Sequence, residues 1–303
     1  MSLGRRSLLT SGAAGVGLAV AGATPSLAAT SPQGPGGAGS GQPGHRPFPP
    51  LIDDPKGLLA LPPGFHYEVV THAGKTKLRD NEGVTPSNHD GTAVFDVGRG
   101  RLRLIQNHEL GAGALLGVPH VHGTVYDRTA LMAGGCTVIE TDRHGRNFGE
   151  WVGISGTHTN CAGGPTPWGT WLTCEETEAK AEDPWNANGQ SGIYSRDHGY
   201  VFEVFGDGKA LPKPIKAFGR YAHEALAIDP SRTHVYLSED ASSPNGLFYR
   251  WTAPGGLKLR SGIANQLDDN AGTLEAMAIL MDDGSVLPDV ATSPRHSSGD
   301  RSA

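Results

Sequence analysis

The sequence predicts an all-β fold, and an internal repeat favours a β-propeller with long loops and short helical turns. Helix signals are sparse, whereas short runs of β-branched and aromatic residues recur between clusters of Gly, Pro, Asn and Asp. The 44 glycines of the 303-residue chain fit many tight turns. This composition suits a sandwich, a barrel or a propeller, so the choice among them depends on whether the segments repeat.

The N-terminus is predicted to be a twin-arginine signal peptide over residues 1–28. Arg5 and Arg6 directly precede an uncharged stretch rich in Ala and Gly, which ends in small residues near Ala28. This stretch falls short of the roughly 20 strongly apolar residues of a spanning helix, so no stable membrane anchor is expected. The alternative is an ordinary secretory signal that carries two chance arginines. We expect a secreted protein whose export partner is the twin-arginine translocase.

The rest of the chain is predicted to hold one folded domain. Residues 29–44 have the composition of a disordered linker, residues 45–290 are expected to form a partial β-propeller domain, and residues 291–303 lack a strand pattern and are expected to be a disordered tail. The net charge is −6, and loss of Arg5 and Arg6 changes it to −8. This acidity argues against a nucleic-acid partner, and a monomer is expected.

Three segments share one plan, in which a strand, a turn and a second strand end on acidic residues. They are Asp90–Glu109, Cys161–Glu176 and Glu224–Asp240. Their closing acids Glu109, Glu175 and Glu239 lie 66 and 64 residues apart. Since common propeller blades repeat at roughly 40 to 50 residues, this spacing implies long loops between the strands. Further strands are expected over His66–Val70, Tyr200–Phe205 and Leu247–Trp251.

The repeat predicts a metal site, because the start of the first strand and the end of the second lie side by side in an antiparallel hairpin. If each hairpin is the inner part of a blade, seven carboxylates and one thiol face the same end of the central channel. They belong to Asp90, Glu109, Cys161, Glu175, Glu176, Glu224, Glu239 and Asp240. Like charges this close repel, so cations are required, and the oxygens suit calcium whereas the sulfur points to a transition metal such as iron. Taken singly, each acid could be a turn residue; their recurrence favours a shared site.

The cysteines and one arginine leave alternatives open. Cys136, Cys161 and Cys174 are an odd number and too few for a disulfide scaffold, so they form either one disulfide with one buried thiol or include a thiol that binds metal. Arg220 is a candidate catalytic residue that would clamp an anion beside the metal site. The alternative for Arg220 is a solvent-exposed salt bridge.

Three motifs in this chain resemble the PhoX family of secreted alkaline phosphatases. They are Asn107–Glu109, Asn160–Glu176 and Arg220–Glu224, and the similarity runs from about Leu51 to Val290. The resemblance implies a twin-arginine exported β-propeller that hydrolyses phosphomonoesters at a cluster of iron and calcium ions. It further implies that the metals act as Lewis acids on the phosphoryl oxygens, so that Ser87 and Ser155 are not candidate nucleophiles.

The resemblance also assigns ligands. It implies that Cys161 is an iron ligand and that Glu224 binds metal, and it places Asp90, Glu109, Glu175 and Glu176 in matching segments. Family members continue well past this length, so we expect an open, C-terminally truncated propeller with little phosphatase activity of its own. The competing functions are a calcium-dependent propeller hydrolase of the lactonase or phytase type, which needs no iron, and a non-catalytic calcium-binding propeller.

Overall fold

The computed structural model describes residues 49–79, 83–242 and 245–287. The predicted signal peptide, linker and C-terminal tail lie outside the described residues. The chain divides into two compact units; the first ends at Tyr67 and the second begins at Glu68. Within the described ranges, no helix has the length and apolar character needed to cross a membrane.

The first unit is a short stretch organised by one carboxylate. Ile52 and Leu61 pair in an antiparallel bridge. Asp54 accepts hydrogen bonds from the backbone N–H groups of Lys56 and Leu58 and from the hydroxyl group of Tyr67. These bonds give the turn its shape, because a carboxylate that accepts several local N–H groups replaces the missing backbone partners.

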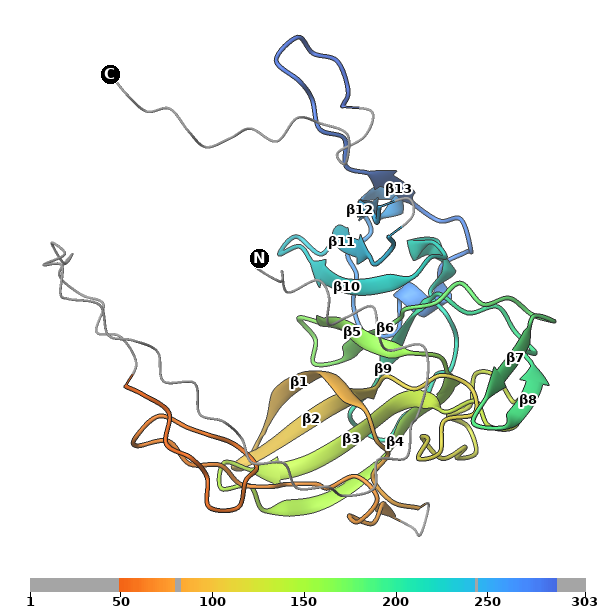
Figure 1. Cartoon of the computed structure of the whole chain (residues 1–303). Coiled ribbons are helices and arrows are strands. Elements are labelled where there is room, and N and C mark those ends of the chain that lie inside the picture. The colour runs from red at the N-terminus through yellow and green to blue at the C-terminus, as the bar shows by residue number, and fades with distance from the viewer. Residues whose placement is uncertain (1–48, 80–82, 243–244, 288–303) are drawn as a thin grey trace, which may run out of the picture. The chain divides into compact units, whose positions relative to one another are not determined.

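The second unit consists of antiparallel sheets that follow one another along the chain (Figure 1). The first sheet has the strand order β1-β2-β3-β4, the second β5-β6-β9 and the third β10-β11-β12-β13, and β7 and β8 form a separate hairpin. The strands are β1 (His89–Gly98), β2 (Arg101–His108), β3 (Gly134–Asp142), β4 (Asn147–Thr157), β5 (Asn160–Pro165), β6 (Trp171–Glu175), β7 (Pro184–Ala187), β8 (Gln190–Ile193), β9 (Val201–Val204), β10 (His223–Ile228), β11 (His234–Glu239), β12 (Phe248–Thr252) and β13 (Thr273–Ala276). Short 3-10 turns lie at Lys216–Phe218, Pro254–Gly256 and Ala264–Gln266.

The three sheets are arranged as propeller blades. The leading strand of the second sheet, β5, contacts β1 of the first sheet and β10 of the third. Leading strands that lie next to one another, with later strands farther out, are the arrangement of blades around a channel. The described residues thus form an open, propeller-type array of three blades, as the sequence predicted.

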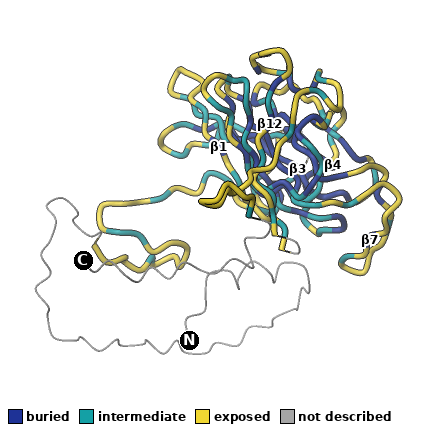
Figure 2. Tube along the Cα trace, turned by 90° about the horizontal axis from the view of Figure 1, so that it is seen from above, coloured by how far each residue is buried: buried dark blue, intermediate teal, exposed yellow. Residues whose placement is uncertain are grey.

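Apolar side chains between neighbouring blades form two cores. Figure 2 shows the buried residues of the second unit in dark blue, concentrated on its inner strands. Between the first and second blades, Ile105 and Val138 pack with Phe202. Between the second and third, Leu172 packs with Trp251. Every residue of β6 is buried, because this strand belongs to the middle blade and is covered on both faces.

The three predicted hairpins are confirmed, and so are the strands expected at Tyr200–Phe205 and Leu247–Trp251, which correspond to β9 and β12. The strand expected at His66–Val70 is wrong, since no strand is found there among the described residues. The segment 66–70 crosses the boundary between the two units, so its two ends form hydrogen bonds in different units. The hydroxyl group of Tyr67 bonds to Asp54 in the first unit, whereas the carbonyl oxygen of Val70 accepts a hydrogen bond from Asn147 in the second. Strand propensity is a weak guide where no neighbouring strand pairs.

Candidate metal centre

Each leading hairpin closes on one pair of facing residues. These pairs are His89 with His108, Asn160 with Glu175, and His223 with Glu239. The residue that follows each partner is the candidate ligand, so each blade offers two ligands at the same end of its hairpin. The resulting pairs are Asp90 and Glu109, Cys161 and Glu176, and Glu224 and Asp240.

A β-bulge occurs at the same position in all three hairpins. After the closing pair, the register advances by three residues on the leading strand but by two on its partner, at Asp90–Gly91, Cys161–Ala162 and Glu224–Ala225. A bulge leaves one residue without a ladder partner and changes the direction of its side chain. The second residue of each bulge is Gly or Ala, and at Gly91 the absence of a side chain leaves room for the backbone of the neighbouring blade. The repeated bulge therefore positions one ligand from each blade.

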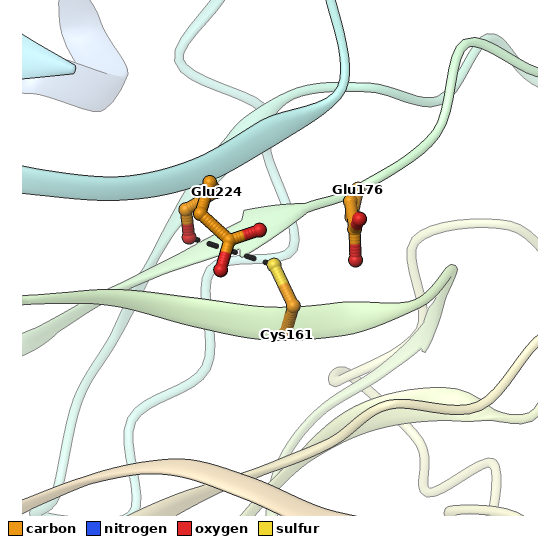
Figure 3. A group of neighbouring side chains, drawn as sticks. All are labelled: Cys161, Glu176 and Glu224. Atoms are coloured by element: carbon orange, nitrogen blue, oxygen red, sulfur yellow. Dashed lines mark hydrogen bonds between the residues drawn. The ribbon is translucent and has the colours of Figure 1, made fainter. Parts of the chain in front are cut away.

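The middle and third blades bring three ligands together. A sulfur or carboxylate oxygen from each of Cys161, Glu176 and Glu224 lies within 4.8 Å of the others (Figure 3). The Cys161 side chain is buried, and its thiol donates to the carbonyl oxygens of His223, at 3.3 Å, and Glu224, at 3.5 Å. One thiol and two carboxylates are a donor set for a borderline transition metal.

Burial and mutual repulsion favour the protonated forms of these three side chains when no cation is bound. Burial raises the pKa of the Cys161 thiol, and the neighbouring Cys174 and Glu224 raise it further. The pKa of Glu176 rises to about 8 through burial, a hydrogen bond with Asp240 and the charge of Glu224. Burial and the charge of Asp240 also raise the pKa of Glu224. A bound cation would reverse these shifts, because metal ligands bind in their deprotonated forms.

The first blade adds an all-oxygen pair to the same electrostatic field. Glu109 and Asp90 share a hydrogen bond, and burial raises the pKa of both carboxyl groups. The charges of Asp90 and Glu224 raise the pKa of Glu109 further. Since Glu224 belongs to the third blade, ligands from all three blades influence one another. This chemistry fits hard cations that prefer carboxylate oxygens.

Glu175 and Glu239 have protein partners instead. Glu175 is fully buried and accepts hydrogen bonds from the N–H groups of His158, Gly199 and Tyr200, at 3.0, 2.8 and 3.1 Å, and from His198, at 2.7 Å. Glu239 accepts from the N–H group of Leu247, at 2.9 Å, and from the hydroxyl group of Tyr249, at 3.1 Å. Metal contacts by these two carboxylates stay predictions.

The sequence-based match of Glu109 with Glu175 and Glu239 is wrong by one residue. The pairing register makes His108 the counterpart of Glu175 and Glu239. The counterparts of Glu109 are therefore Glu176 and Asp240. The error matters because neighbouring residues of a strand point to opposite faces.

Arg220 forms hydrogen bonds with the backbone of the segment that follows Glu176. Its Nη2 donates to the carbonyl oxygens of Glu178 and Ala179, the latter at 3.1 Å. Among the described residues, Arg220 forms no ion pair and its buried Nε has no hydrogen-bond partner. The predicted exposed salt bridge is thus absent from the described part, and the anion clamp stays a prediction.

A buried histidine between two acids was missed by the sequence analysis. His198 lies 2.7 Å from Glu175 through Nδ1 and 3.3 Å from Asp127 through Nε2, and all three side chains are fully buried. Burial alone would lower the pKa of His198, but the charge of Glu175 and the hydrogen bond with Asp127 raise it to about 9. No local motif could reveal this group, because its members are 23 and 71 residues apart.

All three cysteines are free and buried. The alternative in which two of them form a disulfide is therefore not what the structure shows. The remaining alternative, a thiol beside other metal-binding groups, describes Cys161.

The fold and the site together define a propeller-type protein with a candidate metal centre of carboxylates and one thiol. The sequence model described as "Alkaline phosphatase PhoX" matches residues 46–150 and 146–293. The chain belongs to the PhoX alkaline phosphatase family.

Comparison with solved structures gives a similarity to Pseudomonas fluorescens PhoX in complex with vanadate, a transition state analogue, at a TM-score of 0.48 and 23% sequence identity. The matched region covers 71% of this chain and 52% of that chain, so this chain spans about half the length of the solved relative. No curated protein matches the sequence.

Proposed function

We propose that this chain acts in a secreted, metal-dependent phosphomonoesterase with an iron and calcium centre. The observation that carries this proposal is the convergence of Cys161, Glu176 and Glu224 within a chain of the PhoX family. Secretion through the twin-arginine translocase is supported by Arg5 and Arg6. A monomeric state is part of the same proposal.

The donor atoms suggest how the cations are distributed. Cys161, Glu176 and Glu224 would hold iron, because a thiolate is a soft ligand. Asp90 and Glu109, with oxygen donors alone, would hold calcium. When bound, such cations act as Lewis acids on phosphoryl oxygens.

The protonation states of the candidate ligands control how tightly the site binds a cation. In the metal-free state, the Cys161 Sγ proton is directed at the carbonyl oxygen of His223, and the raised pKa of Glu176 favours its protonated form at neutral pH. Ligand binding to a cation releases these protons, so cation affinity rises with pH. The thiol and carboxylates would hold the cations, and the bulges orient the side chains of Asp90, Cys161 and Glu224.

Arg220 is proposed to contact the substrate anion. Two backbone carbonyl oxygens hold its Nη2, which limits the freedom of the guanidinium group. No acidic side chain among the described residues forms an ion pair with Arg220. A guanidinium that no carboxylate neutralises suits recognition of a phosphate oxygen.

Elemental analysis of wild type, Cys161→Ala and Cys174→Ala tests this proposal. Cys174 is a matched control, because it is a fully buried thiol on the adjacent strand. We expect iron to be lost from Cys161→Ala alone and calcium to be retained in all three proteins. Wild-type protein that binds calcium without iron would instead support a calcium-dependent propeller hydrolase or a non-catalytic binding protein. Assays with p-nitrophenyl phosphate and with a lactone substrate then distinguish those two functions, because a non-catalytic protein hydrolyses neither.

A further inference from the structure

Asn107 lies where the first two blades meet, one residue before the end of β2. Its side chain is fully buried, and its Nδ2 donates to the carbonyl oxygens of Cys161, at 3.1 Å, and Ala162, at 2.8 Å. These are the two residues of the β5 bulge. Because the bulge interrupts the ladder, neither residue has a register partner in β6. Asn107 therefore supplies hydrogen bonds that the sheet does not.

The oxygen atom of the Asn107 side-chain amide, Oδ1, also forms hydrogen bonds. It accepts from Trp171 Nε1, at 2.9 Å, from Thr173 Oγ1, at 2.9 Å, and from the Cys136 thiol, at 3.0 Å. An indole N–H can only donate and a backbone carbonyl oxygen can only accept, so the amide has one orientation that satisfies all of these partners. Its two faces thus connect three strands, β3, β5 and β6.

An apolar residue would pack more easily at this position. The surrounding core contains Ile105, Val138 and Trp171, and a buried amide in such surroundings is unfavourable unless it is fully hydrogen-bonded. With Leu at position 107, two backbone carbonyl oxygens of the bulge and one indole N–H group would lose their partners. The amide is thus matched to the bulge, and the bulge carries the thiol of the candidate metal centre.

We propose that Asn107 is a positioning residue for the metal-binding thiol. It fixes the β5 bulge so that the Cys161 side chain meets Glu176 and Glu224, and it thereby sets the affinity and geometry of the metal–thiolate contact. This inference rests on the proposed function in that it assumes a cation at Cys161. Partners that orient a metal ligand from behind commonly change metal affinity by about 10- to 100-fold when they are removed.

The test compares Asn107→Leu and Asn107→Asp with a matched control, Asn265→Leu, in the full chain. Asn265 is also a buried amide that donates to a backbone carbonyl oxygen, that of Lys213 at 2.9 Å. Two readouts are measured: cobalt(II) binding followed by its thiolate charge-transfer absorption, and the rate of Cys161 alkylation by iodoacetamide in metal-free protein. The second readout does not depend on metal binding.

For both Asn107 variants we expect cobalt affinity to fall by about 10- to 100-fold, with a weaker charge-transfer band and faster alkylation of Cys161. Asn265→Leu should lose stability but keep the wild-type spectrum and alkylation rate. Asn107 variants that fold and keep both wild-type readouts would overturn the inference. If wild type binds no cobalt, the proposed metal centre fails, yet the alkylation rates still decide whether Asn107 positions the thiol.

Thr173→Val is a milder variant in case the Asn107 variants do not fold. It removes one donor to Asn107 Oδ1 and leaves the amide in place. We expect the same changes in charge-transfer absorption and alkylation rate, at smaller size. Their absence from folded Thr173→Val would contradict the inference.

Discussion

His198 shows how a single buried side chain organises the end of β6. It occupies one oxygen of Glu175, and the backbone N–H groups of Gly199 and Tyr200 occupy the other. With Glu175 held in this way, the next residue along the chain, Glu176, turns to the opposite side and faces Cys161. Adjacent acids of the same chemistry thus have different roles.

The His198 contacts predict a pH dependence of stability. Its pKa is about 9 in the folded protein, against an ordinary value of 6.5, because the charge of Glu175 and the hydrogen bond with Asp127 outweigh burial. The stabilisation that it provides is therefore complete below pH 6.5 and is lost as the pH rises through about 9. We expect the difference in unfolding free energy between wild type and His198→Gln to shrink over this interval in urea titrations. A difference that stays constant with pH would contradict the assigned protonation.

An exposed histidine provides the control for this experiment. His144 lies in the turn between β3 and β4, and its backbone N–H group, rather than its ring, bonds to Asp142. His144→Gln should change the free energy of unfolding far less than His198→Gln does.

At the scale of the element, the hairpins could be predicted from the sequence but their registers could not. Each hairpin is a short local segment whose strand and turn residues are contiguous, so its existence follows from the pattern. A bulge depends on how two strands pair and on what packs against them. The one-residue error in matching Glu109 to Glu175 and Glu239 came from this source. For the same reason, the sequence identified the ligand-bearing segments but could not tell which of two adjacent acids faces the centre.

The bulge of β1 predicts a steric limit. A Cβ atom at Gly91 would lie 2.8 Å from the Cα atom of Ala162 and 2.9 Å from the carbonyl oxygen of Cys161, both backbone atoms of the neighbouring blade. We expect Gly91→Ala to destabilise the protein by about 1–3 kcal/mol, because the blades must separate locally. The measurement is the shift of the urea unfolding midpoint.

The matched control is Gly111→Ala, whose new Cβ atom would meet the His158 ring at 3.4 Å, an ordinary contact. This variant should be close to wild type in stability. Equal midpoints for Gly91→Ala and wild type would show that the two blades do not approach as closely as described.

At the scale of the whole second unit, the candidate metal centre lies where the three blades meet, beside hydrogen bonds between blades such as those from Asn107 to Cys161 and from Cys161 to His223. Its candidate ligands come from β1, β5 and β10 and from the ends of β2, β6 and β11. Before metal binds, burial and repulsion among these acids oppose the close approach of the blades. Cation binding would replace that repulsion with attraction across both blade interfaces.

Metal should therefore stabilise the unit as a whole. At a cation concentration 100-fold above its Kd, binding to the folded state contributes about 2.7 kcal/mol. For a domain of this size we expect the thermal midpoint to rise by about 5 to 10 °C when calcium and iron are added to metal-free protein. Differential scanning calorimetry checks this, with Glu224→Gln as the variant in which the increase should be much smaller. If the thermal midpoint of wild type does not change when metal is added, the prediction that bound metal stabilises the blade interfaces is wrong.

The three bulges have one backbone form but carry three different side chains, Asp90, Cys161 and Glu224. The same backbone arrangement therefore presents an oxygen donor in two blades and a sulfur donor in the third. Exchanging these three side chains by substitution would change the donor atoms of the candidate centre while the strands that present them stay the same, which makes the repeated hairpin a scaffold for redesigning metal preference.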